Sequence, residues 1–418
     1  MKIRFLGGCR EVGRSAFMVE AGGKRILLDY GVLMDREVGF PAHISPRELD
    51  AIILTHAHLD HSGATPIFYI RGRMPIYGVE PTFSLTELLI KDFLHLSGYY
   101  LPYEYIDVRT MLGHCVGKSY RSRFSIGEVE VELLNAGHIP GSCQVLIEAD
   151  GRRFLYTSDL NKTATRLLEH ADTDYGDLDA IMIEGTYANE DHSDRLKLEE
   201  EFIAHTSEVV ERGGVALVPA FGVGRSQEVL LILEAHHFQH PVFVDGMALK
   251  AIEIMKKHEG SLRDPDLFMR AIRNADWIER WQDRRKAVKT PSVIVSPAGM
   301  LKGGAAIFYT ESIADKKQNA ILLVSYQVPG TPGRVLLEKK KFTLRGKVRD
   351  VAADVGRYDF SSHCGRNELM DTLSALDGKT KVFVVHGAEG NCENLSGWAS
   401  DKLGLSAVAP KPGEEHVI

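Results

Sequence analysis

Short runs of apolar and alternating residues predict a β-sheet in the first part of the chain. Residues 3–6, 16–20 and 25–29 are runs of this kind, and turns that contain glycine separate them. A fourth run, residues 51–54, is apolar throughout and is typical of a buried strand. This part of the chain therefore predicts a sheet whose early strands are joined as hairpins.

The apolar spacing becomes helical over residues 81–105 and then returns to strands. Further strands are expected at residues 128–134, 144–149, 153–157 and 180–183. From about residue 189, strands and amphipathic helices alternate, which is typical of a parallel sheet covered by helices. The strands expected there are residues 215–219, 242–244, 293–296 and 321–325, and the helices are residues 196–211 and 226–234.

Hairpin-like sequence returns after about residue 347, and a last strand is expected at residues 381–385. The change of pattern and its reversal predict one domain inserted into another. We therefore expect a first domain made of residues 1–188 and 348–418, and an inserted α/β domain made of residues 189–347.

Potential metal ligands follow several of the predicted strands. The run 51–54 is followed by four of them within six residues, namely His56, His58, Asp60 and His61. The others at strand ends or in adjoining turns are Asp29, His138, Asp159, Glu184 and His386. Because strand ends on one side of a sheet converge, these distant residues are expected to share one site.

The cluster of residues 56–61 favours a metal centre over an ordinary core or surface role, because four ligands at this spacing are difficult to satisfy otherwise. In this spacing, His56 and His58 can hold one ion while Asp60 and His61 hold a neighbour. Each remaining strand-end residue is weaker evidence when taken alone. For Asp29, a helix cap or a surface turn is the alternative role.

Composition narrows the class of protein without revealing its chemistry. The 418 residues carry a net charge of −7, so no global basic excess indicates nucleic acid. The five cysteines are scattered and odd in number, which favours reduced thiols. A signal peptide and a membrane-spanning stretch are not expected from the apolar runs. We therefore expect a soluble, cytoplasmic protein that does not bind membranes.

By order and spacing, these residues resemble the motifs of a known family. Asp29, residues 56–61, His138 and Asp159 look like the four ordered motifs of the metallo-β-lactamase fold. Glu184 with Thr186 and Tyr187, then His363 and His386, look like motifs A, B and C of its nucleic-acid-processing β-CASP branch. The resemblance spans essentially the whole chain. It is closest to compact archaeal relatives of the cleavage and polyadenylation specificity factor nuclease, and RNase J is more distant.

The resemblance implies an α/β fold, an αββα metallo-β-lactamase sandwich with an inserted α/β β-CASP domain. It implies two zinc ions, with manganese as the alternative metal. The first ion would be held by His56, His58 and His138, the second by Asp60, His61 and His386, with Asp159 as the bridge. Asp29 would accept a hydrogen bond from a ligand histidine.

The implied catalytic residues are His363, Glu184 and Asp60. The family pattern makes His363 the general acid, oriented and charged by Glu184, and a structural hydrogen bond is the alternative role for His363. Arg225, in a glycine-rich segment that opens a predicted helix, and Ser361 are candidate substrate contacts; a tight turn is the alternative for Arg225. Basic runs at residues 118–123, 280–289 and 339–349 are further candidates.

The implied activity is hydrolysis of RNA phosphodiesters by a two-metal hydroxide mechanism with a histidine general acid. Cleavage would be endonucleolytic, leave 5′-phosphate and 3′-hydroxyl ends, and serve RNA 3′-end processing or decay. A histidine at position 386 favours RNA over DNA within this branch. The resemblance also allows a homodimer and RNA-processing or exosome-type partner proteins. The alternatives are a 5′-to-3′ exoribonuclease like RNase J, an inactive RNA-binding scaffold and a small-molecule hydrolase.

Overall fold

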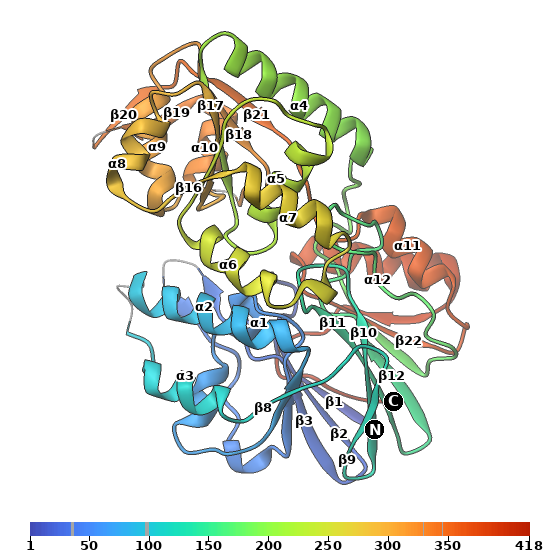
Figure 1. Ribbon diagram of the computed structural model, residues 1–418. Coiled ribbons are helices and arrows are strands. Elements are labelled where there is room, and N and C mark those ends of the chain that lie inside the picture. The colour runs from blue at the N-terminus through green and yellow to red at the C-terminus, as the bar shows by residue number, and fades with distance from the viewer. Residues whose placement is uncertain (35–36, 97–99, 329, 345) are drawn as a thin grey trace. The chain divides into compact units, whose positions relative to one another are not determined.

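The computed structural model describes residues 1–34, 37–96, 100–328, 330–344 and 346–418 and divides the chain into two compact units (Figure 1). The first unit consists of Met1–Ala164, Glu169–Asp191 and Ser362–Ile418. The second consists of Thr165–Leu168 and His192–Ser361. One unit is therefore inserted into the chain of the other.

The first unit contains two seven-stranded sheets. In spatial order, the strands of the first sheet are β24 (Glu415–Val417), β1 (Lys2–Gly7), β2 (Ala16–Ala21), β3 (Lys24–Leu28), β6 (Ala51–Ile53), β7 (Ile76–Gly78) and β8 (Cys115–Gly117). Those of the second are β23 (Ser406–Val408), β22 (Lys381–Val385), β13 (Ala180–Glu184), β12 (Arg152–Tyr156), β11 (Cys143–Ala149), β10 (Val129–Asn135) and β9 (Arg123–Ile126).

Alternating apolar side chains divide each sheet between two cores. In β3, Ile26 and Leu28 belong to the core shared by both sheets, whereas Leu27 faces the opposite way. Aromatic contacts join the sheets, with ring centroids 5.3 Å apart for Phe17 and Tyr156. The sheets therefore pack face to face.

Helices cover the outer faces of both sheets. Those on the first sheet are α2 (Glu80–Leu96) and α3 (Tyr105–Leu112), and those on the second are α11 (Arg366–Ser374) and α12 (Glu389–Leu403). The unit is thus an αββα sandwich, as the sequence predicted.

The second unit is built on one six-stranded sheet in which every pair of neighbouring strands is parallel. The strand order is β16 (Asp276–Ile278), β15 (Val242–Asp245), β17 (Ser292–Pro297), β14 (Val215–Ala220), β18 (Ala320–Leu323) and β21 (Asp354–Arg357). Strands β14 and β18 are buried along their whole length, as expected for a parallel sheet covered on both faces.

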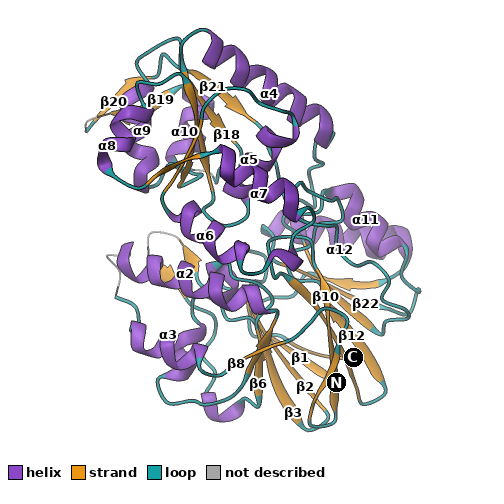
Figure 2. Ribbon diagram, viewed as in Figure 1, coloured by secondary structure: helices purple, strands orange, loops and turns teal. Residues whose placement is uncertain are grey.

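Figure 2 shows helices packed along this sheet, and α4, α5 and α9 contact its central strands. The helices of the unit are α4 (Arg195–Glu211), α5 (Arg225–Ala235), α6 (Met247–Lys256), α7 (Pro265–Asn274), α8 (Trp281–Ala287), α9 (Gly304–Ile313) and α10 (Pro332–Lys339). A separate hairpin consists of β19 (Lys341–Leu344) and β20 (Lys347–Asp350). The predicted alternation of strands and helices is therefore present.

Helix and domain boundaries differ in part from those expected. Of the helical stretch predicted over residues 81–105, α2 covers the part up to Leu96, residues 97–99 lie outside the described residues, and residues 100–104 precede α3 without being helical. Residues 165–168 and 348–361, expected in the first domain, lie in the second unit, the latter because β21 pairs with β18, whereas residues 189–191 lie in the first unit. In the described part of the chain, the helices are too short or too polar to span a membrane.

Candidate metal centre

The dense histidine motif occupies the turn after β6 and the start of the short helix α1 (Leu59–Ser62). His138 lies between β10 and β11, Asp159 follows β12, and His386 follows β22. All of these residues belong to the first unit. The strand ends of both sheets thus bring together the ligands that the sequence places up to 330 positions apart.

The carboxylate of Asp159 lies between two groups of histidines. Its Oδ2 is 3.5 Å from Nε2 of His56 and 3.5 Å from Nε2 of His138. Its Oδ1 is 3.3 Å from Nε2 of His61 and 3.5 Å from Nε2 of His386. One carboxylate therefore presents a separate oxygen to each group, which is the arrangement needed to bridge two cations.

The remaining two motif residues complete these groups. His58 Nδ1 lies 3.0 Å from His138 Nε2, and Asp60 Oδ2 lies 3.7 Å from His386 Nε2. Sets of potential ligand atoms that lie within 4.8 Å of one another are His56, His58, His138 and Asp159; His56, Asp60 and His61; and His61, Asp159 and His386. The structure thus brings every predicted metal ligand into one cluster.

Two buried atoms of the cluster indicate that it is shaped for cations. Nε2 of His56 and Oδ1 of Asp159 are buried and have no hydrogen-bond partner among the described residues. Leaving such atoms unsatisfied costs about 1–3 kcal/mol each. Converging imidazole and carboxylate lone pairs are the donor set that divalent transition metals prefer. The residues present therefore fit a pair of divalent metal ions.

Asp29 fixes the orientation of His61. Its Oδ2 accepts hydrogen bonds from His61 Nδ1 at 2.8 Å, Thr55 Oγ1 at 2.8 Å and Tyr156 OH at 3.0 Å. Its Oδ1 accepts the backbone N–H of Thr55 at 2.8 Å. Because Nδ1 of His61 is bound to Asp29, Nε2 is the nitrogen that faces Asp159.

Sequence reasoning missed the groups that orient the other histidines. Ser15 Oγ lies 2.8 Å from His386 Nδ1, and the carbonyl of Ser362 lies 2.8 Å from His138 Nδ1. Ser362 adjoins the predicted His363, which is a signal that could have found it. Ser15 carries no such signal, because its contact depends on where β2 begins in three dimensions.

Burial keeps three of the histidines neutral. It lowers the pKa of His56 and His138 well below the usual range, and it lowers the pKa of His58 to about 4. A neutral imidazole offers a lone pair to a metal, whereas a protonated one repels it. These three rings are therefore in the ligating form at neutral pH.

His61 and Asp159 are shifted in the opposite sense by their mutual attraction. Against burial, which would lower it, the carboxylates of Asp159 and Asp29 raise the pKa of His61 well above its usual value. Against burial, which would raise it, the rings of His386, His61 and His56 hold the pKa of Asp159 well below its usual range. Asp159 therefore stays ionised inside the protein.

His363 and Glu184 form a pair beside the cluster. His363 Nδ1 lies 3.0 Å from Oε1 and 3.1 Å from Oε2 of Glu184, whose Oε1 also accepts the backbone N–H of Leu160 at 2.7 Å. The His363 ring is 4.5 Å from that of His138, measured between centroids. Glu184 is buried, while the side chain of His363 is 18% exposed. His363 is therefore the partly accessible member of the pair.

Backbone conformation at the strand ends is unusual where the ligands gather. Asp29, Ser158 and His386 have φ angles of 57°, 52° and 47°, in the left-handed region that non-glycine residues rarely adopt. Each follows a strand directly or nearly so, and each turns the chain sharply at the cluster. Such strain is typical of functional sites held by their surroundings.

A glycine permits the closest backbone approach around the motif. A Cβ atom on Gly31 would lie 1.8 Å from the carbonyl oxygen of Asp60, so no side chain fits there. The amide of Tyr30 donates to the carbonyl of His61 at 2.8 Å, and that of Val32 donates to the carbonyl of Leu59 at 2.9 Å. The segment after β3 is therefore bound directly to the backbone of the histidine motif.

The candidate substrate contacts lie outside this cluster. Arg225 begins α5, and Ser361 is the last residue of the second unit, with its carbonyl 3.4 Å from the Arg195 guanidinium. Both therefore belong to the second unit.

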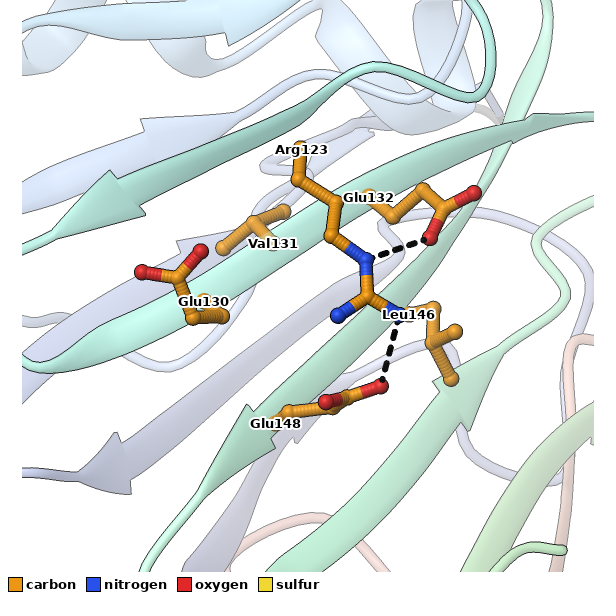
Figure 3. A pocket seen from close by; sticks show the side chains of 6 residues that line it. All are labelled: Arg123, Glu130, Val131, Glu132, Leu146 and Glu148. Atoms are coloured by element: carbon orange, nitrogen blue, oxygen red, sulfur yellow. Dashed lines mark hydrogen bonds and ion pairs between the residues drawn. The ribbon is translucent and has the colours of Figure 1, made fainter.

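Two of the three basic runs are partly neutralised. In residues 118–123, Arg121 pairs with Asp172, and Figure 3 shows Arg123 between Glu132 at 3.3 Å and Glu148 at 3.5 Å. In residues 280–289, Arg284 pairs with Asp245 at 2.7 Å. The run 339–349 includes residue 345, which lies outside the described residues.

Three family models match this chain. "Metallo-beta-lactamase superfamily" matches residues 9–205, "Beta-Casp domain" matches residues 226–336, and "Zn-dependent metallo-hydrolase RNA specificity domain" matches residues 348–410. The last match begins where the sequence analysis placed the return to the first domain.

Similar curated proteins extend over nearly the whole chain. "RNase aCSPSF2" of Saccharolobus solfataricus is 39% identical over 99% of this chain and 84% of its own length. "Probable RNase MJ4" of Methanocaldococcus jannaschii is 35% identical over 99% of both chains. A crystal structure of a protein of unknown function from Enterococcus faecalis has a similar fold, with a TM-score of 0.63 at 15% identity over 100% of this chain and 99% of that one.

Proposed function

This chain belongs to the metallo-beta-lactamase superfamily and carries its Beta-Casp domain, and from that premise we propose that it is a metal-dependent ribonuclease. The observation that carries the proposal is the position of Asp159, which presents one oxygen to each of two groups of histidines. We propose endonucleolytic hydrolysis that leaves 5′-phosphate and 3′-hydroxyl ends, in RNA 3′-end processing or decay.

The cluster would hold two divalent ions. His56, His58 and His138 would hold the first and Asp60, His61 and His386 the second, with Asp159 between them. When bound, the ions supply a water-derived nucleophile at neutral pH and positive charge against the phosphate oxygens. The five histidines favour zinc, and manganese is the alternative. Asp29 keeps His61 in the tautomer that binds through Nε2.

His363 would donate the proton that the leaving group needs. With Nδ1 held by Glu184, the Nε2–H of His363 can point to the substrate, and the carboxylate stabilises the positive ring. As water attacks phosphorus, the bond from phosphorus to the 3′ oxygen breaks and that oxygen takes the proton from Nε2. The products are therefore a 3′-hydroxyl end and a 5′-phosphate end.

Cleavage of a defined, end-labelled RNA tests the proposal. We expect wild-type protein to cut internally, and His363→Ala to slow cleavage roughly 10²–10⁴-fold while the metal content stays unchanged. Asp60→Ala should lose both activity and metal. The matched control is His416→Ala, because His416 also pairs with a glutamate, Glu414 at 3.2 Å, but lies outside the cluster.

Each alternative gives a different result in the same assay. Release of mononucleotides solely from 5′-monophosphate ends would make the protein an exoribonuclease. RNA left uncut by metal-loaded protein would overturn the ribonuclease proposal, and turnover of a thioester would then indicate a small-molecule hydrolase. Equal metal loss in His363→Ala and Asp60→Ala would overturn the general-acid role of His363.

The cellular setting is part of the same proposal. The five cysteines are free thiols, and four of them are buried. Free thiols in this number are typical of proteins kept in a reducing compartment, which supports the expectation of a cytoplasmic enzyme acting on RNA.

A further inference from the structure

We propose that Phe221 and Tyr326, at one edge of the sheet in the second unit, form a platform on which bases of single-stranded RNA stack. This inference rests on the proposed ribonuclease function, because it concerns how the same substrate is held. The platform consists of residues of the second unit alone.

The two aromatic residues lie at the same edge of the sheet. Phe221 directly follows β14, which ends at Ala220, and Tyr326 follows β18, which ends at Leu323. Strands β14 and β18 are parallel neighbours, so their carboxyl ends lie side by side. This edge of an open parallel sheet is where ligands bind in such folds.

Both aromatic residues are exposed although their chain neighbours are buried. Phe221 is 39% exposed and Tyr326 is 38% exposed, whereas Ala220 is fully buried and Ser325 is 2% exposed. A large aromatic ring that is exposed to water gives up the favourable free energy that its burial would contribute to folding. Two exposed rings at one edge of the sheet therefore favour a binding role for this edge.

A third loop holds the platform together. Gly299, after β17, lies close to both of these loops, because a Cβ there would be 3.3 Å from the Ala220 carbonyl carbon and 3.4 Å from both the Phe221 nitrogen and Ser325 Oγ. The amide of Gln327 donates to the carbonyls of Gly299 and Ser325, each at 2.9 Å. The loops that carry the rings are thus fixed to one another.

The Phe221 loop is also anchored on its other side. The side-chain amide of Gln227 donates to the carbonyls of Gly222 and Ala248, each at 3.1 Å. Both glutamines, Gln227 and Gln327, are buried. A platform that is rigid before binding loses little conformational entropy when a ligand stacks on it.

The charged residues of the three loops that follow β14, β17 and β18 indicate which class of ligand binds there. Residues 221–225, 298–304 and 325–331 contain no aspartate or glutamate, although the chain has 57 acidic residues and a net charge of −7. They contain Arg225 and Lys302. Aromatic rings combined with cations and without carboxylates are the chemistry that binds single-stranded nucleic acid, through stacked bases and neutralised phosphates. Single-stranded RNA is therefore the occupant to which we commit.

Binding of a short fluorescent RNA tests the platform without cleavage when it is measured in the His363→Ala background. We expect Phe221→Ala and Tyr326→Ala each to weaken binding roughly tenfold, and Phe221→Trp to keep wild-type affinity. Phe221→Leu retains apolar volume without a ring face and should bind as weakly as Phe221→Ala. The matched control is Tyr100→Ala, an aromatic residue that is 95% exposed in the first unit.

The decisive comparison uses RNA in which single positions lack a base. Removing a stacked base should abolish the difference between wild type and Phe221→Ala. If Phe221→Ala binds as tightly as the wild type, or if its affinity falls by the same factor on intact and abasic RNA, the proposal of a stacking platform is overturned. RNA that is bound and sensitive to these variants but never cut by the wild type would overturn the ribonuclease proposal and leave the platform standing.

Discussion

Asp29 decides at the residue scale which nitrogen of His61 faces the cluster. Its Oδ2 accepts a hydrogen bond from Nδ1 of His61. A neutral amide in place of the Asp29 carboxylate would remove the negative charge and could present an N–H to the same nitrogen. We predict that Asp29→Asn lowers metal affinity about 10–100-fold. Competition with a chelator measures this. Asp50→Asn, which changes an aspartate bound to Lys24 and the Arg25 amide, should bind metal like the wild type.

The buried histidines make the metal-free protein sensitive to acid. Burial lowers the pKa of His56, His58 and His138. Below about pH 6.5 these histidines therefore bind protons in the unfolded chain but not in the folded chain, so the free energy of unfolding falls as the pH falls. For His58 this continues to about pH 4. His61 has a raised pKa and opposes the trend, but it is outnumbered.

We therefore predict that the free energy of unfolding of chelator-treated protein falls between about pH 7 and about pH 5. The fall is up to about 1.4 kcal/mol per pH unit for each proton that the unfolded chain binds in excess of the folded chain. Urea unfolding at the two pH values measures the change. Stability that is constant or rises on acidification would contradict the assignment of these rings as neutral in the folded protein.

Candidate metal ligands were easier to predict than the residues that orient them. Histidines and aspartates in a dense motif or at strand ends carry their chemistry in the sequence, and every predicted ligand lies in the cluster. Ser15 and the carbonyl of Ser362 act through position alone, because any serine or any backbone carbonyl offers the same atoms. Such contacts follow from the fold and leave no mark on the local sequence.

At the scale of elements, Gly31 tests how tightly the chain after β3 holds the motif. A methyl group on Gly31 would collide with the Asp60 carbonyl, 1.8 Å away. We predict that Gly31→Ala destabilises the protein by about 1–3 kcal/mol and loses metal, although residue 31 contributes no ligand. Thermal unfolding and metal analysis measure both effects. Gly378→Ala, where nothing lies within 4 Å of the added carbon, should change neither.

Long buried strands were predictable, and two short strands near one edge of the first sheet were not. Strands β14 and β17 lie within one or two residues of their predicted bounds, because a continuous apolar run is an unambiguous signal. Strands β7 and β8 have three residues each and were missed, since so short a segment shows no period. Their position is set by tertiary pairing, of β7 with β6 and of β8 with β7.

At the scale of the whole molecule, metal should stabilise one unit specifically. The cluster belongs to the first unit, and a ligand that binds only the folded state adds about 2.7 kcal/mol at a hundredfold excess over its dissociation constant. We predict that chelation speeds hydrogen exchange in β3, β6 and β12 while exchange in β14 and β18 is unchanged. Equal acceleration in both units would contradict a site confined to the first.

The existence of an insertion was predictable from the sequence, and its far boundary depends on the criterion. The change of pattern places the boundary at residue 347, and a family model matches from residue 348, whereas contacts within the chain place the boundary after Ser361. The difference is β21, which follows a hairpin in sequence but completes the parallel sheet of the second unit. The local sequence pattern indicates local structure only, whereas β21 joins the sheet by pairing with β18, which lies earlier in the chain.

The route of the chain sets an order of events during synthesis. His56, His58, His138 and Asp159 emerge from the ribosome before the second unit, whereas His363 and His386 follow it in residues 362–418, where β24 pairs with β1. The contiguous residues 192–361 emerge between them. His386 is therefore the last of the candidate ligands to be synthesised, and the full set is present only after residues 192–361 have been made.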